Sequence, residues 1–88
     1  MIGGIKHKNA GSITTGPMYL RTIIWSGFTD TAHLLTIKDG NGELLIEGMV
    51  ATGSTTTGGG PIVIPVGGWV DGIETDTIGS GQVNYIIG

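Results

Sequence analysis

Glycine breaks this chain into short pieces, and that spacing most constrains what it can fold into. Eighteen of the 88 residues are glycine, and runs rich in Ile, Val, Leu and Thr lie between them. A helix needs apolar residues at three- and four-residue spacing, and glycine interrupts nearly every such window. β-Branched residues favour strands. The sequence therefore predicts an all-β chain of brief strands and tight turns.

Turn residues divide the chain into six or seven short strands. The strongest turn is Asp-Gly-Asn-Gly at 39–42, because Asp-Gly and Asn-Gly accept the positive φ angles of a tight hairpin. It predicts a hairpin of strands 33–38 and 43–50. Further strands are expected at 18–26 (opened by Pro17), 61–66 (an edge strand, because of Pro65), 69–77 and 82–87. This spacing predicts an antiparallel β-sandwich or a small β-barrel.

The chain is expected to hold one domain, because 88 residues are too few for two. Residues 1–12 are predicted to form an N-terminal arm with an extended piece at 2–6, and residues 13–88 a single β domain. The Thr-, Ser- and Gly-rich segment 52–60 predicts a flexible loop.

Composition points to contacts with other chains. A domain of this size buries a thin core, which small folds usually supplement with disulfides, metals or partner subunits. The chain has no cysteine, and its two histidines, His7 and His33, are too few for a structural zinc site. Only 12% of residues are charged, about half the usual share. Exposed apolar surface usually marks an interface, so we expect a homo-oligomer.

Two classes of partner are not expected. No apolar run approaches the roughly 18 residues of a membrane helix, so we expect no membrane association. The net charge is −3, and only Lys6 and Lys8, on either side of His7, make a basic segment ahead of an acidic body. Nucleic-acid binding needs a broad basic face, so we expect no nucleic-acid partner. The arm is instead expected to contact an acidic neighbouring subunit and to add an inter-chain strand.

The residue types of catalysis are present without their usual context. Ser26, Asp30 and His33 are those of a hydrolytic triad, but no Gly-x-Ser-x-Gly elbow surrounds Ser26. A loop with a polar rim is the simpler interpretation. We expect no catalytic residues and no enzyme activity.

Candidate metal and cofactor sites are also weak. The turn at 39–42 lacks the spacing of a calcium loop, and Gly58–Gly60 lacks the lysine and helix of a phosphate loop. Asp71, Glu74 and Asp76 are expected on a solvated strand, with Asp71 on the face opposite the other two. We expect no metal site and no cofactor.

The two tryptophans have different expected roles. Trp25 shares a strand face with Tyr19 and Ile23, which predicts core packing. Trp69 follows two glycines; core packing is the first expectation, a protein interface the second and sugar binding the third. The candidate interface residues are Lys6, Lys8 and Trp69.

Two segments carry a family resemblance. Ile-Trp-Ser-Gly-Phe-Thr at 24–29, followed by Leu-Thr-Ile-Lys-Asp-Gly-Asn-Gly-Glu-Leu at 35–44, resembles small structural proteins of tailed bacteriophages. The resemblance covers residues 20–50 and, less closely, 69–87. It implies a non-enzymatic virion component assembled in the host cytoplasm: a capsid cement or decoration subunit, or a piece of the tail or neck. Its partners would be copies of itself and a major capsid or tail protein.

Two alternatives stay open at this stage. The first is a carbohydrate- or receptor-binding module, with Trp69 and Tyr85 as stacking platforms. An exposed Trp69 near acidic or amide groups would favour it. The second is an enzyme, which would require Ser26, His33 and a carboxylate to converge.

Overall fold

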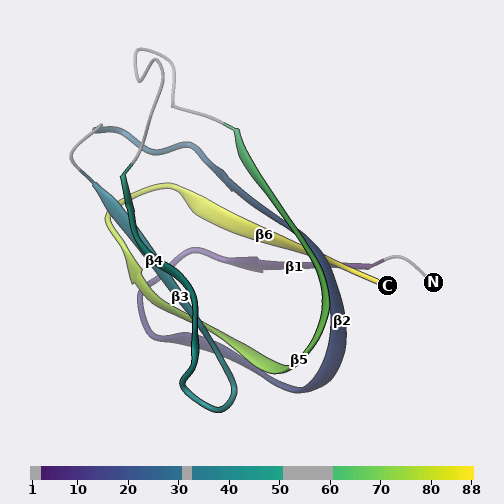
Figure 1. The fold of residues 1–88 in the computed structure, drawn as a ribbon. Helices are drawn as coiled ribbons and strands as arrows, with labels where there is room; N and C mark the ends of the chain where they lie inside the picture. The colour runs from purple at the N-terminus through teal and green to yellow at the C-terminus, as the bar shows by residue number, and fades with distance from the viewer. Residues whose placement is uncertain (1–2, 31–32, 51–60) are drawn as a thin grey trace.

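The fold is one open antiparallel sheet. The computed structural model describes residues 3–30, 33–50 and 61–88. The strands are β1 (Gly3–His7), β2 (Ser12–Ser26), β3 (Leu34–Asp39), β4 (Leu44–Val50), β5 (Ile62–Ile78) and β6 (Gln82–Ile87). They follow the order β1-β6-β2-β5-β3-β4 (Figure 1). The all-β prediction is confirmed, and the described part of the chain has no helix that could cross a membrane.

Two strands are much longer than the sequence suggested. β2 has 15 residues and β5 has 17, so β5 joins the two strands expected on either side of Gly67. Their pairing shifts register between Thr14 and Pro17 and again between Leu20 and Thr22. Such bulges bend a strand and increase its twist. β2 and β5 therefore curve together (Figure 1), and the sheet folds back so that β1 side chains reach β5.

Positive-φ glycines mark both bends. Gly16 and Gly72 have φ angles of 101° and 102° at the first register shift, and Gly67 has 67° at the second. Glycine adopts these angles without the steric cost that other residues incur. The Gly67-Gly68 sequence, expected as a turn between two strands, is thus a bend within one strand.

Of the three prolines, the two that lie within strands occupy positions where the strand has a single neighbour. Pro17 pairs with β5 at a position that β6 does not reach, and Pro65 pairs with β2 beyond the end of β3. Proline cannot donate to a second ladder, so these are the tolerated positions. The edge strand expected at 61–66 is wrong, because this segment belongs to β5, an interior strand that lacks a second neighbour only locally at Pro65.

The core lies inside the bend. Its buried apolar side chains come from β2 to β6 and the segment after β2: Leu20, Ile23, Trp25, Phe28, Leu35, Ile37, Ile46, Ile73, Val83 and Tyr85. Trp25 packs on Phe28 with ring centroids 4.8 Å apart, and its Nε1 donates to the Ser80 carbonyl at 2.9 Å. Core packing of Trp25 is confirmed.

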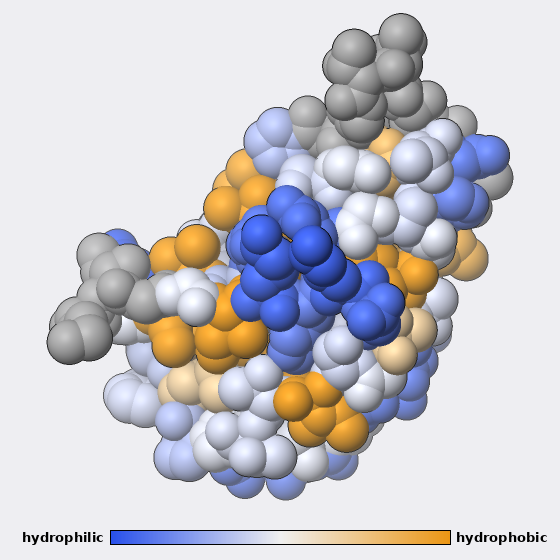
Figure 2. All heavy atoms as spheres, turned by 180° about the vertical axis from the view of Figure 1, so that it is seen from behind, coloured by the Kyte–Doolittle hydropathy of each residue, from blue (hydrophilic) through white to orange (hydrophobic). Residues whose placement is uncertain are grey.

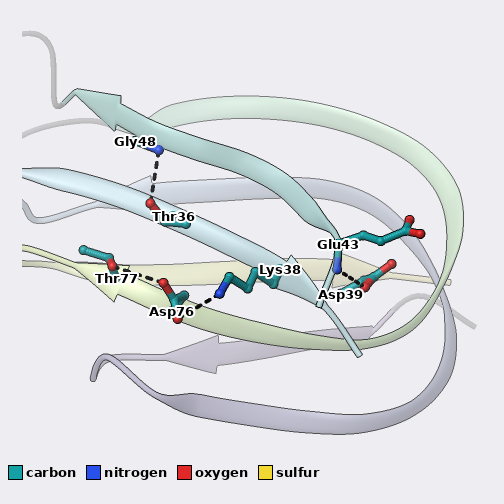
Figure 3. Close-up of polar contacts among 7 residues, drawn as sticks. All are labelled: Thr36, Lys38, Asp39, Glu43, Gly48, Asp76 and Thr77. Atoms are coloured by element: carbon teal, nitrogen blue, oxygen red, sulfur yellow. Dashed lines mark hydrogen bonds and ion pairs between the residues drawn. The ribbon is translucent and has the colours of Figure 1, made fainter. Parts of the chain in front are cut away.

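The β3–β4 hairpin forms at the predicted turn. The Asp39 carboxylate accepts hydrogen bonds from the backbone N–H groups of Asn41 and Glu43, each at 2.9 Å. Figure 3 shows the bond from Glu43. Gly42 supplies the positive φ. Gly40 packs directly on β5, and a Cβ added there would collide with the carbonyl oxygen of Asp71. The turn is therefore fixed both by its own hydrogen bonds and by the neighbouring strand.

The N-terminal segment differs from an arm. β1 pairs with β6 of its own chain, from Gly3 opposite Ile87 to His7 opposite Val83, and β2 begins at Ser12. The extended piece expected at 2–6 is therefore an integral edge strand at Gly3–His7. The loop expected at 52–60 lies outside the described residues.

Candidate functional site

An exposed aromatic pair stands on the surface of β2 and β5. Trp69 is 74% exposed and lies opposite Tyr19 in the strand pairing. The two rings meet edge to face, with centroids 5.7 Å apart and planes at 78°. The expected core position of Trp69 is wrong. Its neighbour Gly68 pairs with the buried Leu20, so strand alternation turns Trp69 to the opposite face.

The aromatic pair, Trp69 and Tyr19, has the properties of a contact site. Tryptophan combines a large apolar surface with few rotatable bonds and is enriched among residues that dominate binding energy. The Tyr19 ring supports one side of the indole, which restricts its rotamers. Other large apolar side chains are also exposed: Ile13, Leu34, Leu44, Val63 and Val66. Figure 2 shows hydrophobic patches on one face of the molecule, separated by a central hydrophilic group.

The other two candidate interface residues lie elsewhere. Lys6 and Lys8 are both exposed. Lys6 pairs with Asn84 of β6, which pairs in turn with Ile24 of β2. The strand pairings thus place Lys6 level with Ile24, further along β2 than Tyr19. Lys6 lies on β1 and Lys8 directly follows this strand, whereas Trp69 belongs to a separate site.

A buried polar network ties β1 into the fold. His7 is only 6% exposed and packs inside its own chain, so its expected place in a basic arm is wrong. Its Nδ1 lies 2.8 Å from the Thr75 hydroxyl and its Nε2 lies 2.8 Å from the Thr14 hydroxyl. The Thr75 hydroxyl also bonds the Tyr85 hydroxyl at 2.6 Å, and the His7 and Tyr85 rings meet edge to face. This His7 network joins β1, β2, β5 and β6.

The electrostatics of the His7 network favour a neutral state. A neutral imidazole has one donor and one acceptor nitrogen, and hydroxyl partners satisfy either tautomer. Burial lowers the pKa of His7, and burial raises the pKa of Tyr85 to about 12 against the opposing effect of its bond to Thr75. The network is thus a structural connection between strands. Because Tyr85 is buried, it cannot serve as the exposed stacking platform that the sugar-binding alternative required.

His33 has a serine partner, but a different one from the sequence hypothesis. Its Nδ1 lies 2.7 Å from the Ser80 hydroxyl, which also accepts a hydrogen bond from the Thr29 N–H at 2.9 Å. Ser26 instead pairs with Gln82 in the sheet. The His33–Ser80 contact holds the β5–β6 turn against the segment that precedes β3.

Three carboxylates border a hollow at the first bend. Asp39, Asp71 and Glu74 line a space of about 290 Å³ together with residues of β2. The expected separation of Asp71 from Glu74 is wrong, because the positive φ of Gly72 changes the strand alternation between them. Asp76 forms an ion pair with Lys38 at 3.5 Å (Figure 3). Within residues 3–30, 33–50 and 61–88, no group of three His, Cys, Asp or Glu residues is arranged to bind a metal ion.

Comparisons with known proteins add no relative. No family model, curated protein or solved structure matches this chain. The functional conclusion therefore depends on the surface geometry.

Proposed function

We propose that this chain is a non-enzymatic viral structural subunit, of the capsid cement or decoration type. It attaches to copies of itself and to a major capsid or tail protein through repeated protein–protein contacts. The single observation that carries the proposal is the exposure of Trp69, 74% of whose surface faces solvent while Tyr19 holds the ring edge to face.

The physical support comes from the cost of that exposure. Indole surface facing water is unfavourable and is removed by contact with a partner. A chain with 12% charged residues also has little charge with which to oppose association. A single small contact of this kind is weak, but repetition over many copies on a particle gives avidity. We propose a virion as the place of assembly because the segments 24–29 and 35–44 resemble structural proteins of tailed bacteriophages.

Substitution of Trp69 tests the proposal. We expect Trp69→Ala to weaken assembly at least tenfold in sedimentation velocity, since central aromatic contacts contribute about 2 kcal/mol or more. Leu44→Ala on β4 is the matched control, because it removes an exposed apolar side chain away from the aromatic pair. Equal sedimentation of the wild-type and W69A chains would contradict the proposal.

A second candidate function is favoured by the same observation. An exposed tryptophan beside a perpendicular tyrosine offers two faces to a sugar ring, and Tyr19 takes the place expected for Tyr85. A carbohydrate-binding module would show saturable quenching of Trp69 fluorescence by oligosaccharides, and W69A would abolish it. Absence of quenching across neutral and acidic oligosaccharides would exclude this candidate.

A further inference from the structure

The sheet has two open edges, and they differ in their suitability for pairing. β1 and β4 end the strand order, so each has one side without a strand partner among the described residues (Figure 1). An unpaired edge presents a row of N–H and C=O groups to another chain. Proteins that must not associate there disrupt the edge with bulges, prolines or charges.

The β4 edge is disrupted. Its pairing with β3 shifts register twice, between Leu35 and Ile37 and between Ile37 and Lys38. Gly48 has a φ of 59°, and its N–H donates to the Thr36 hydroxyl at 3.1 Å (Figure 3). Glu47 is exposed beside it. A bulged and acidic edge is a poor template for a further strand.

The β1 edge is regular. All five residues of β1 pair with β6 without a register shift, and none is proline. The His7 network fixes the strand from inside, through Thr14 and Thr75. The edge is therefore preformed, and a partner strand would not have to order it.

We infer that β1 is a self-association edge, on which β1 of a second copy pairs antiparallel about a two-fold axis at Ile5. The inference rests on the proposed function, because it names a second surface, besides the aromatic pair, through which copies of the subunit contact one another. A two-fold contact uses the same patch on both copies. It would join two six-stranded sheets into one continuous sheet.

The register follows from Lys6. A lysine on an edge strand opposes pairing when it faces another lysine. With Ile5 opposite Ile5 of the second copy, Lys6 lies opposite Gly4. Gly4 is exposed, and the nearest atom to a Cβ added there is the Tyr85 carbonyl oxygen at 4.0 Å. Gly4 therefore leaves room for the lysine, and the two Lys6 side chains stay apart.

Charge substitutions at Gly4 test this register. Gly4→Glu would place an opposite charge across from Lys6, and Gly4→Lys a like charge. Both side chains fit the open space at Gly4. We expect G4E to tighten the dimer and G4K to weaken it, each by roughly 2- to 30-fold in dissociation constant, because the symmetric dimer contains the contact twice. Glu47→Lys, a charge change on the exposed β4 edge, should leave the constant unchanged.

Cysteine cross-linking gives an independent readout. The chain has no cysteine, so a single introduced thiol can form only an intermolecular disulfide. Facing residues of antiparallel strands have Cα atoms about 4.5–5.5 Å apart, which suits a disulfide. We expect oxidation of the I5C chain to give a covalent dimer and oxidation of the E47C chain to leave monomer.

The outcomes separate the edge from the proposed function. Equal dimer constants for G4E and G4K, or cross-linking of E47C in place of I5C, would overturn pairing at β1. Those results would not affect the proposal that Trp69 forms a contact, because sedimentation of the W69A chain tests that proposal separately. A mass of 9.0 kDa for G4E at every concentration would also overturn the inference.

Discussion

Removal of the Thr75 hydroxyl should destabilise the fold more than any other single-atom change in the His7 network. Thr75 is fully buried, and its hydroxyl bonds both the His7 ring at 2.8 Å and the Tyr85 hydroxyl at 2.6 Å. Thr75→Val keeps the side-chain shape and leaves two buried polar groups without that partner. Each such group costs about 1–3 kcal/mol, so we expect a loss of about 2–6 kcal/mol.

That loss is a large fraction of the expected free energy of unfolding of the whole chain. A chain of this length is stable by roughly 5–10 kcal/mol. The melting temperature of a domain of this size falls by about 4–8 °C per kcal/mol, so T75V should lower it by at least about 8 °C. Urea denaturation followed by circular dichroism gives the free energy of unfolding directly.

The control for this prediction lies on the same strand. Thr77 is exposed on β5, and its hydroxyl has only a long bond of 3.4 Å to Asp76. Thr77→Val should change the free energy of unfolding by less than about 0.5 kcal/mol. If T75V destabilised the chain no more than T77V, the His7 network would not be what holds the four strands together.

Three further predictions follow from the same contacts. Burial lowers the pKa of His7, so the folded chain binds a proton at this residue less tightly than the unfolded chain. The contribution of His7 to stability should be full above pH 6.5 and decrease as pH falls through the folded pKa. His7→Asn should remove this pH dependence from urea denaturation measured between pH 7 and 5.5. Burial raises the pKa of Tyr85 to about 12. The free energy of unfolding should therefore fall by about 2–3 kcal/mol as pH rises from 10 to 12. Tyr85→Phe should flatten that decline. Gly40→Ala should cost about 1–3 kcal/mol because its Cβ would collide with the Asp71 carbonyl, whereas Gly68→Ala, with open space around its Cβ, should be near neutral in the same denaturation assay.

Local chemistry made some features predictable. The β3–β4 hairpin depends on a turn whose Asp39 carboxylate bonds its own backbone within four residues, so the information lies within the segment itself. Core packing of Trp25 followed from its place in a strongly apolar strand. The all-β class followed from the composition.

Long-range pairing and bulges were not predictable in the same way. β1 pairs with β6 from the other end of the chain, and His7 acquires partners 7 and 68 residues away. No local pattern encodes those contacts. The bulge at Gly67 looks like a turn in the sequence, because the same positive φ serves both purposes, and the bulge at Gly72 falls within a strand expected to be continuous. They shift strand alternation, and this is why Trp69 is exposed and Asp71 lies beside Glu74.

The solution mass of the unaltered chain tests the central claim of self-association most directly. Light scattering over a concentration series at neutral pH would give it. We expect twice the 9.0 kDa mass of the chain at low concentration and larger assemblies as concentration rises. A mass of 9.0 kDa at every concentration would contradict a subunit that assembles through its own surfaces.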